Sequence, residues 1–148
     1  MGQQGSSPDW MYQNSRPNDN GYFENMTRII FQAGLNWRII DSKWPNFRRA
    51  FSDFSIDTVA KYDETGVERL MNDAGIVRNR SKIVATITNA KQFQTIMRKH
   101  GSFQSYLDSL DKSDNYALTV KELTKTFSRL GPSSARIFLY SVGENITI

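Results

Sequence analysis

The chain has 148 residues, of which 39% are hydrophobic and 23% charged. This length suits one domain with one core, and no apolar run approaches the roughly 20 residues that a membrane-spanning helix needs. Cysteine is absent and His100 is the single histidine, which excludes disulfides and removes the usual ligands of a zinc or haem site. The net charge of +4 favours an anionic partner such as nucleic acid, but charge alone does not identify one.

Residues 1–20 are rich in Gly, Ser, Gln, Asn and Pro, which predicts a poorly ordered arm ahead of a single domain over residues 21–148. The first residues have neither the basic start nor the apolar core of a secretory signal, so we expect a cytoplasmic protein. Trp10, Met11 and Tyr12 interrupt the polar composition. They are either an apolar clip that docks the arm or the aromatic wall of a pocket.

The first half of the domain shows apolar residues at helical spacing. The pattern predicts a helix over 22–33 that ends at Gly34, and a second over 44–51 with Pro45 in its first turn. A short helix follows, capped by Ser55 or Asp57. Another begins at Asp63 and ends near residues 74–75.

The second half contains the clearest helical pattern, over residues 81–98, which Gly101 ends. A short helix is predicted over 102–110 and a polar turn over 111–116. Thr119 and Glu122 form a capping box for a helix through Arg129, and the last helix covers 135–142. Because no segment alternates with the period of a strand, the fold class is all-α.

Residues 130–136, with the sequence LGPSSAR, join two of these helices through a tight turn. Such a hairpin exposes backbone N–H groups at a helix N-terminus, where they and the helix dipole favour a phosphate. Ser133 and Ser134 add hydroxyl donors, and Arg136 adds a positive charge. The alternative is an ordinary Gly-Pro turn between helices.

Residues 73–83, with the sequence DAGIVRNRSKI, place three cations around another turn that leads into a helix N-terminus. Arg78, Arg80 and Lys82 are therefore candidates for contacts with an anion. The alternative is a solvated basic turn, because runs of charge usually face water.

Residues 31–37, with the sequence FQAGLNW, place one amide within an apolar run and a large aromatic after a turn. Gln32 either bonds to a neighbouring loop or is positioned for a ligand. Trp37 belongs either to the core or to a pocket wall. No nucleophile motif and no phosphate-cradling glycine loop is present, so the sequence identifies no catalytic residue.

Together, the segments YFE at 22–24, QAGLNW at 32–37, DAGIVRNRSKI at 73–83 and the hairpin at 131–140 resemble the 3-methyladenine DNA glycosylase I family. This family belongs to the helix-hairpin-helix DNA glycosylases, and in order and spacing the resemblance covers about residues 21–143. The QAGLxW and DAGIxRxRxKI strings are the most specific parts of the match.

The resemblance implies a compact helical bundle that flips an alkylated, cationic purine out of double-stranded DNA and hydrolyses its glycosidic bond. Flipping is needed because the stacked base is out of reach of an enzyme. A cationic base is already a good leaving group, so a strong general base is not required. We expect a monomer without cofactor, metal or membrane contact. The expected base pocket consists of Trp37, Gln32, Tyr22, Glu24 and Tyr12, and the expected DNA contacts are Arg78, Arg80, Lys82, Ser133, Ser134 and Arg136.

The chain departs from the family pattern at three points. Ile29 stands where the family commonly has the glutamate that reads adenine, and Glu24 lies too far around the helix to replace it directly. The Cys and His that bind zinc and tie the family's termini together are missing. The N-terminal segment that carries the family's tyrosines is replaced, with Tyr12 or Tyr22 as substitutes. Two alternatives remain, a helix-hairpin-helix DNA-binding module with a vestigial pocket and a helical protein-interaction domain.

Overall fold

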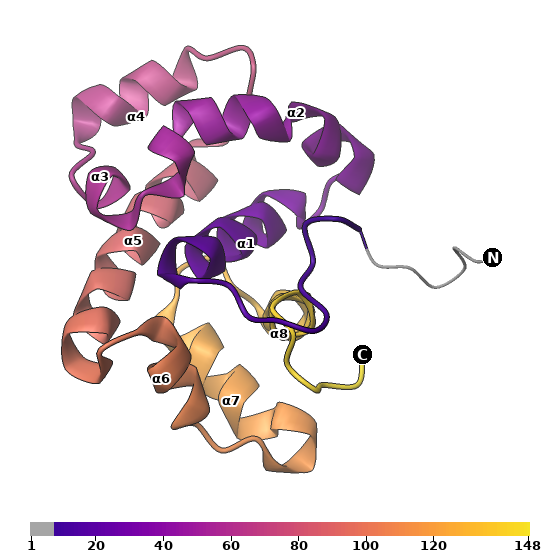
Figure 1. Ribbon diagram of the computed structural model, residues 1–148. Coiled ribbons are helices and arrows are strands. Elements are labelled where there is room, and N and C mark those ends of the chain that lie inside the picture. The colour runs from indigo at the N-terminus through magenta and orange to yellow at the C-terminus, as the bar shows by residue number, and fades with distance from the viewer. Residues whose placement is uncertain (1–7) are drawn as a thin grey trace.

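Helix α1 (Asp19–Gln32) runs through the middle of the bundle in the computed structural model, which describes residues 8–148 (Figure 1). The Asn18 side chain caps α1 by accepting a hydrogen bond from the Gly21 backbone N–H. Helices α2, α3, α5, α6 and α8 all contact α1. Most of α1 beyond its first turn is consequently buried, including the polar side chains of Asn25 and Arg28.

The other helices wrap around α1, with the long α5 connecting the α3–α4 end to the α6–α7 end (Figure 1). No helix in residues 8–148 is long and apolar enough to cross a bilayer. The helices are α2 (Trp37–Ala50), the short η1 (Ser52–Phe54), α3 (Ile56–Ala60), α4 (Glu64–Met71), α5 (Arg80–His100), α6 (Phe103–Asp108), α7 (Ser113–Thr126) and α8 (Pro132–Ser141).

The predicted all-helical class is confirmed, and α5, α6 and α8 lie close to their predicted positions. Gly101, with φ of 88°, ends α5 as expected. Helix α2 differs because it begins at Trp37 rather than Trp44. Asn36 caps it by accepting from the Arg38 backbone N–H, and Pro45 lies inside the helix without ending it.

The capping box predicted at Thr119 is wrong. The Thr119 hydroxyl is buried and donates to the Asp111 carbonyl at 2.6 Å, so it holds the preceding turn instead of starting a helix. Helix α7 already begins at Ser113, although Asp114, Asn115 and Tyr116 have φ values of 58°, 55° and 70°. These positive values belong to a left-handed turn, which agrees with the polar turn predicted over 111–116.

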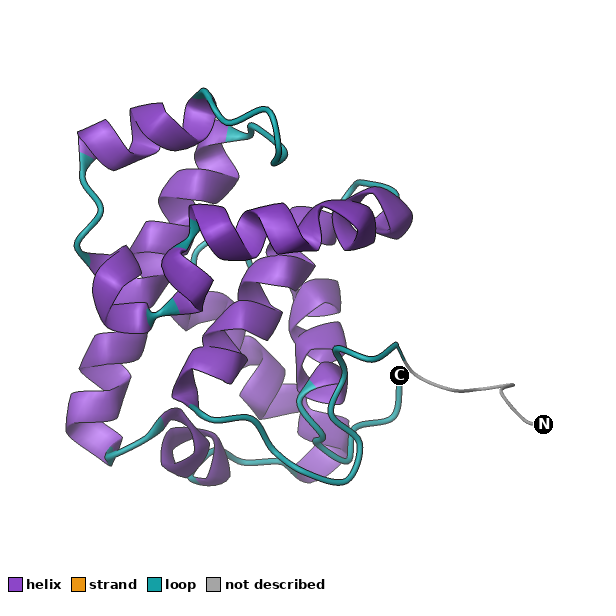
Figure 2. Ribbon diagram, turned by 45° about the horizontal axis from the view of Figure 1, so that its top comes forward, coloured by secondary structure: helices purple, strands orange, loops and turns teal. Residues whose placement is uncertain are grey.

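The N-terminal segment packs against α1 and α8 from Trp10 onward, and it lies beside the C-terminal tail (Figure 2). The Tyr12 backbone N–H donates to the Ser141 carbonyl at 2.8 Å, in a parallel bridge with Val142. The buried Asn25 amide donates to the Trp10 and Ser141 carbonyls. The segment at Trp10 and Tyr12 therefore docks on the domain, as the first alternative predicted, and Trp10 also lines a cavity, as the second did.

Candidate base pocket and nucleic-acid interface

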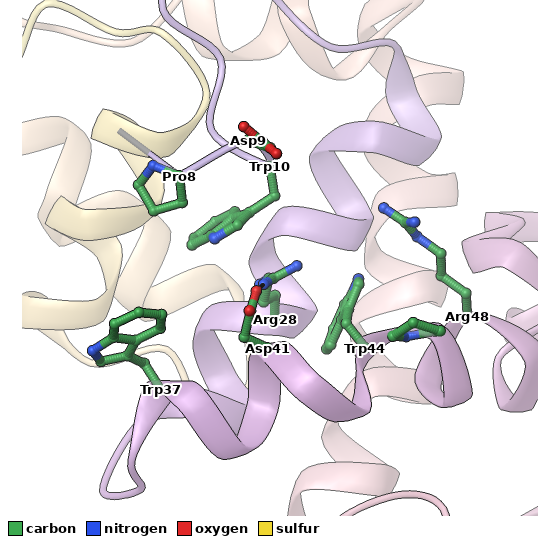
Figure 3. A pocket seen from close by; sticks show the side chains of 9 residues that line it. Pro8, Asp9, Trp10, Arg28, Trp37, Asp41, Trp44 and Arg48 are labelled. Atoms are coloured by element: carbon green, nitrogen blue, oxygen red, sulfur yellow. Dashed lines mark hydrogen bonds and ion pairs between the residues drawn. The ribbon is translucent and has the colours of Figure 1, made fainter. Parts of the chain in front are cut away.

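A cavity of about 720 Å³ opens between the N-terminal segment, α1 and α2 (Figure 3). Helix α2 supplies most of its lining, since residues 37, 41, 44, 45 and 48 recur at the spacing of one helical face. Three indole rings and two ion-paired arginines dominate the lining. Its residues are Pro8, Asp9, Trp10, Arg28, Trp37, Asp41, Trp44, Pro45 and Arg48.

Arg28 forms the floor of this cavity with its side chain only 5% exposed. Its guanidinium lies 4.5 Å from the centroid of the Trp10 ring and 5.1 Å from that of Trp44, and Nη2 donates to Asp41 Oδ1 at 2.6 Å. Burial lowers the pKa of Arg28, an effect that Asp41 opposes, but arginine stays charged in proteins. Arg28 thus fixes two of the indoles and one carboxylate at the same time.

Glu24 lies one helical turn before Arg28 on α1 and supports two residues of the cavity lining. Its Oε2 accepts hydrogen bonds from Trp44 Nε1 and from Arg48 Nε, both at 2.8 Å. Glu24 does not line the cavity itself; it holds the ring and the guanidinium that do. Each arginine of the lining is consequently matched by a carboxylate, and Asp9 adds a further negative charge.

Trp37 stands at the cavity with 53% of its surface exposed. It follows the turn at Gly34, whose φ of 80° suits glycine, and so projects from the first turn of α2. The Arg38 guanidinium lies 5.4 Å from the ring centroid. An indole held at the mouth of a cavity and half open to solvent is a surface on which a planar ligand can stack.

Four residues expected at the pocket do not line the cavity: Glu24, which supports it, and Tyr22, Tyr12 and Gln32, which lie elsewhere. Tyr22 is fully buried in the core, with its ring 4.8 Å from that of Phe103. Tyr12 lines a separate hollow beside Tyr140, and Gln32 is half-buried outside the cavity lining. Asp41 lies before the predicted start of α2 at Trp44, so the spacing that places it on one face with Trp37 was not apparent.

The position of Tyr22 leads to a prediction about stability. Its hydroxyl is buried without a hydrogen-bond partner among the described residues, so Tyr22→Phe should stabilise the protein by about 1 kcal/mol.

The same variant should change how stability depends on pH. Burial raises the pKa of Tyr22 above its ordinary value of 10, so the folded protein holds this proton more tightly than the unfolded chain does. Stability is therefore lost as pH rises beyond about 10, and the variant should lose less. Urea unfolding at pH 8 and 10.5 measures both effects; lower stability at pH 8 would contradict this placement.

The hairpin between α7 and α8 presents a free helix N-terminus. Gly131, the N-cap of α8, supplies no side-chain acceptor, and Pro132 and Ser133 are exposed. Asn89 fixes the turn, since it accepts from the Ser128 N–H at 2.8 Å and donates to the Ser128 carbonyl at 3.1 Å. The backbone N–H groups of Ser133 and Ser134 are thus available for an anion.

The cations expected to contact DNA differ in their surroundings. Arg78 is exposed, while Arg80 is paired with Glu64 and with Glu68, whose carboxylates raise its pKa. Arg136 is half-buried and donates to the Thr147 carbonyl at 2.9 Å. Of these three arginines, Arg78 and Arg136 are therefore the two that no carboxylate of the described residues pairs with.

Lys82 has a structural role that the sequence analysis did not foresee. Its side chain is buried, and Nζ donates to the Phe31 carbonyl at 3.2 Å and the Ala33 carbonyl at 2.7 Å. Burial, with a smaller contribution from the positive charge of Arg129, lowers its pKa. Lys82 joins the end of α1 to the start of α5 beside the hairpin turn.

A helical bundle with an exposed hairpin turn and an aromatic cavity fits the class of DNA glycosylases that the sequence resembles, and comparison with known proteins agrees. The family model described as methyladenine glycosylase matches residues 8–137. The chain therefore belongs to the methyladenine glycosylase family, as the sequence analysis predicted.

Individual relatives support the same conclusion. DNA-3-methyladenine glycosylase 1 of Escherichia coli K12 is 47% identical over 62 residues, which are 42% of this chain and 33% of that protein. DNA-3-methyladenine glycosylase of Haemophilus influenzae is 25% identical over 82% of this chain and 75% of its own length. A crystal structure of a variant of 3-methyladenine DNA glycosylase I from Staphylococcus aureus has a TM-score of 0.78 at 25% identity, covering 90% of this chain and 81% of that one.

Proposed function

We propose that the protein is a DNA repair glycosylase that removes alkylated, cationic purines resembling 3-methyladenine from double-stranded DNA. The observation that carries this proposal is the half-exposed Trp37 ring at the edge of an aromatic cavity. The exposed N-terminus of α8, which suits a DNA phosphate, supports it. Membership in the methyladenine glycosylase family supports the reaction class. We infer that the protein acts as a monomer in the cytoplasm, with residues 21–148 as the single domain.

The reaction begins when the damaged nucleotide rotates out of the duplex into the cavity, where its base stacks on Trp37. The bond between the sugar C1′ and the base nitrogen then breaks. Its electron pair neutralises the positive charge of the base, so the leaving group needs no protonation. Water adds to C1′ and loses a proton to solvent. Since both arginines of the lining are paired with carboxylates, the cavity does not repel a cationic base.

Base release from methylated duplex DNA tests this proposal. Trp37→Ala should lower the single-turnover rate by roughly 10- to 100-fold, the effect expected when one base–aromatic stack is lost. Leu35→Ala is the matched control, because Leu35 is exposed on the same turn but does not line the cavity. Released bases are measured by chromatography.

The second candidate, a DNA-binding module with a vestigial pocket, is favoured by Ile29, which is buried and brings no carboxylate to the cavity. If the wild-type protein binds duplex DNA but releases no alkylated purine above background, catalysis is rejected and this candidate stands. If it neither binds DNA nor releases a base, both assignments fail.

The proposed DNA surface comprises Arg78, Ser133, Ser134 and Arg136. Replacing Arg78 or Arg136 with alanine should weaken duplex binding and reduce the slope of log K against log salt by about 1 each. Arg98→Ala is the control, because Arg98 is exposed at the opposite end of α5. Fluorescence anisotropy measures the affinity for duplex DNA at several salt concentrations between about 50 and 200 mM, which gives the slope. Unchanged slopes in both variants would show that DNA does not bind at this surface.

A further inference from the structure

The cavity has a carboxylate that family resemblance did not predict. Asp41 lies one helical turn after Trp37 on α2, and its side chain is 56% exposed. Its Oδ1 is held by Arg28 Nη2 at 2.6 Å, and the described residues offer Oδ2 no hydrogen-bond partner. Figure 3 shows the carboxylate against the Arg28 guanidinium, below the Trp10 ring and to the right of the Trp37 ring. An acceptor atom thus faces the space that a base stacked on Trp37 would occupy.

The anchor of this carboxylate is unusually rigid. Arg28 is buried between two indole faces, so its guanidinium has little freedom to turn away from Asp41. A charged acceptor fixed by a buried partner discriminates between ligands more sharply than a mobile one. The long Arg28 side chain therefore orients Asp41 as well as filling the floor of the cavity.

The neighbouring carboxylates are less suited to this task. Glu24 Oε2 already accepts from Trp44 and Arg48, and the residue does not line the cavity. Asp9 lines it, but Asp9 is exposed on the N-terminal segment, and no ion pair holds it among the described residues. Asp41 alone among these three is both fixed in position and open to the cavity.

We propose that Asp41 is the residue that determines base specificity, by accepting a hydrogen bond from the exocyclic amino group of a flipped adenine. This inference rests on the proposed function, because it assigns the substrate class of the same cavity. Adenine carries the N6 amino donor at the position where guanine carries the O6 acceptor, which a carboxylate repels. The protein should therefore prefer 3-methyladenine to 3-methylguanine, and Asp41 should set that preference.

The test is the ratio of kcat/KM for release of 3-methyladenine and of 3-methylguanine from otherwise identical duplexes. Asp41→Asn should reduce this ratio about tenfold or more, because an amide can present either a donor or an acceptor. A purely structural role would slow both reactions equally and leave the ratio unchanged. The ratio is also insensitive to the fraction of the variant that folds.

Two matched variants complete the experiment. Asp57→Asn removes the same charge on α3, far from the cavity lining, and should leave the ratio unchanged. Asp9→Asn removes the other carboxylate of the lining. The proposal is overturned if Asp41→Asn changes the ratio by less than about twofold, or if Asp9→Asn changes it more than Asp41→Asn does. Either result leaves the proposed glycosylase function standing.

If the wild-type protein releases neither base, the proposed function fails and the ratio cannot be formed. Quenching of tryptophan fluorescence by free 3-methyladenine then decides whether Asp41 recognises adenine. About tenfold weaker binding by Asp41→Asn would support base recognition in a non-catalytic pocket. Equal binding by the wild type and the variant, or no binding by either, would overturn the inference.

Discussion

Replacing Lys82 with methionine should destabilise the protein by about 3 kcal/mol, lowering Tm on the order of 10 °C. The substitution preserves the volume of the side chain but removes both hydrogen bonds that Nζ donates to the carbonyls at the end of α1. Those carbonyls lack partners within the helix, and the Phe31 carbonyl lies in a buried environment. Urea unfolding of both proteins measures the difference.

The same variant separates a structural role of Lys82 from DNA binding. Lys91→Met is the control, since Lys91 is exposed on α5 and should change stability by less than about 0.5 kcal/mol. At a temperature where both variants are folded, Lys82→Met should keep the wild-type salt slope of duplex binding. If Lys82→Met is as stable as the wild type and its salt slope of duplex binding falls by about 1, Lys82 contacts DNA instead.

Glu144→Gln should cost about 2 kcal/mol, because it removes the buried charge of a cluster that joins the two ends of the chain. The Glu144 side chain is 6% exposed and pairs with Arg16 at 3.2 Å and Lys112 at 2.9 Å. The Tyr116 hydroxyl donates to it at 2.9 Å and accepts from the Asn145 N–H. Glutamine keeps the shape of the side chain but removes the buried negative charge. Arg16 and Lys112 then keep only the more exposed Asp108, at 2.6 and 3.3 Å.

Thermal unfolding of Glu144→Gln, with Glu68→Gln as the control, tests this role. Glu68 also pairs with an arginine, Arg80, but its side chain is 57% exposed, so its loss should change stability far less than the loss of Glu144. Equal small effects in both variants would show that the cluster does not hold the termini. The cluster joins Arg16 of the N-terminal segment to Glu144 of the C-terminal tail.

Much of the fold could be predicted from the sequence because local signals agreed with the final packing. The stripe of apolar residues in 81–98 and the glycine at 101 defined α5, since helical periodicity and a left-handed C-cap are local properties. The QAGLNW and DAGIVRNRSKI strings indicated the family that the comparisons show. Trp37, chosen from the first string, does line the cavity.

The tertiary structure decided which polar side chains face the cavity. Lys82 and Arg78 look alike in a basic turn, but only Lys82 lies where a helix end needs donors. The sequence resemblance predicted Tyr22 at the base pocket, but the helices that surround α1 bury it in the core. Arg28, Asp41 and Trp10 come from three segments that meet only after folding. Sequence spacing therefore fixes the face of a helix, whereas packing determines whether that face becomes core, support or binding surface.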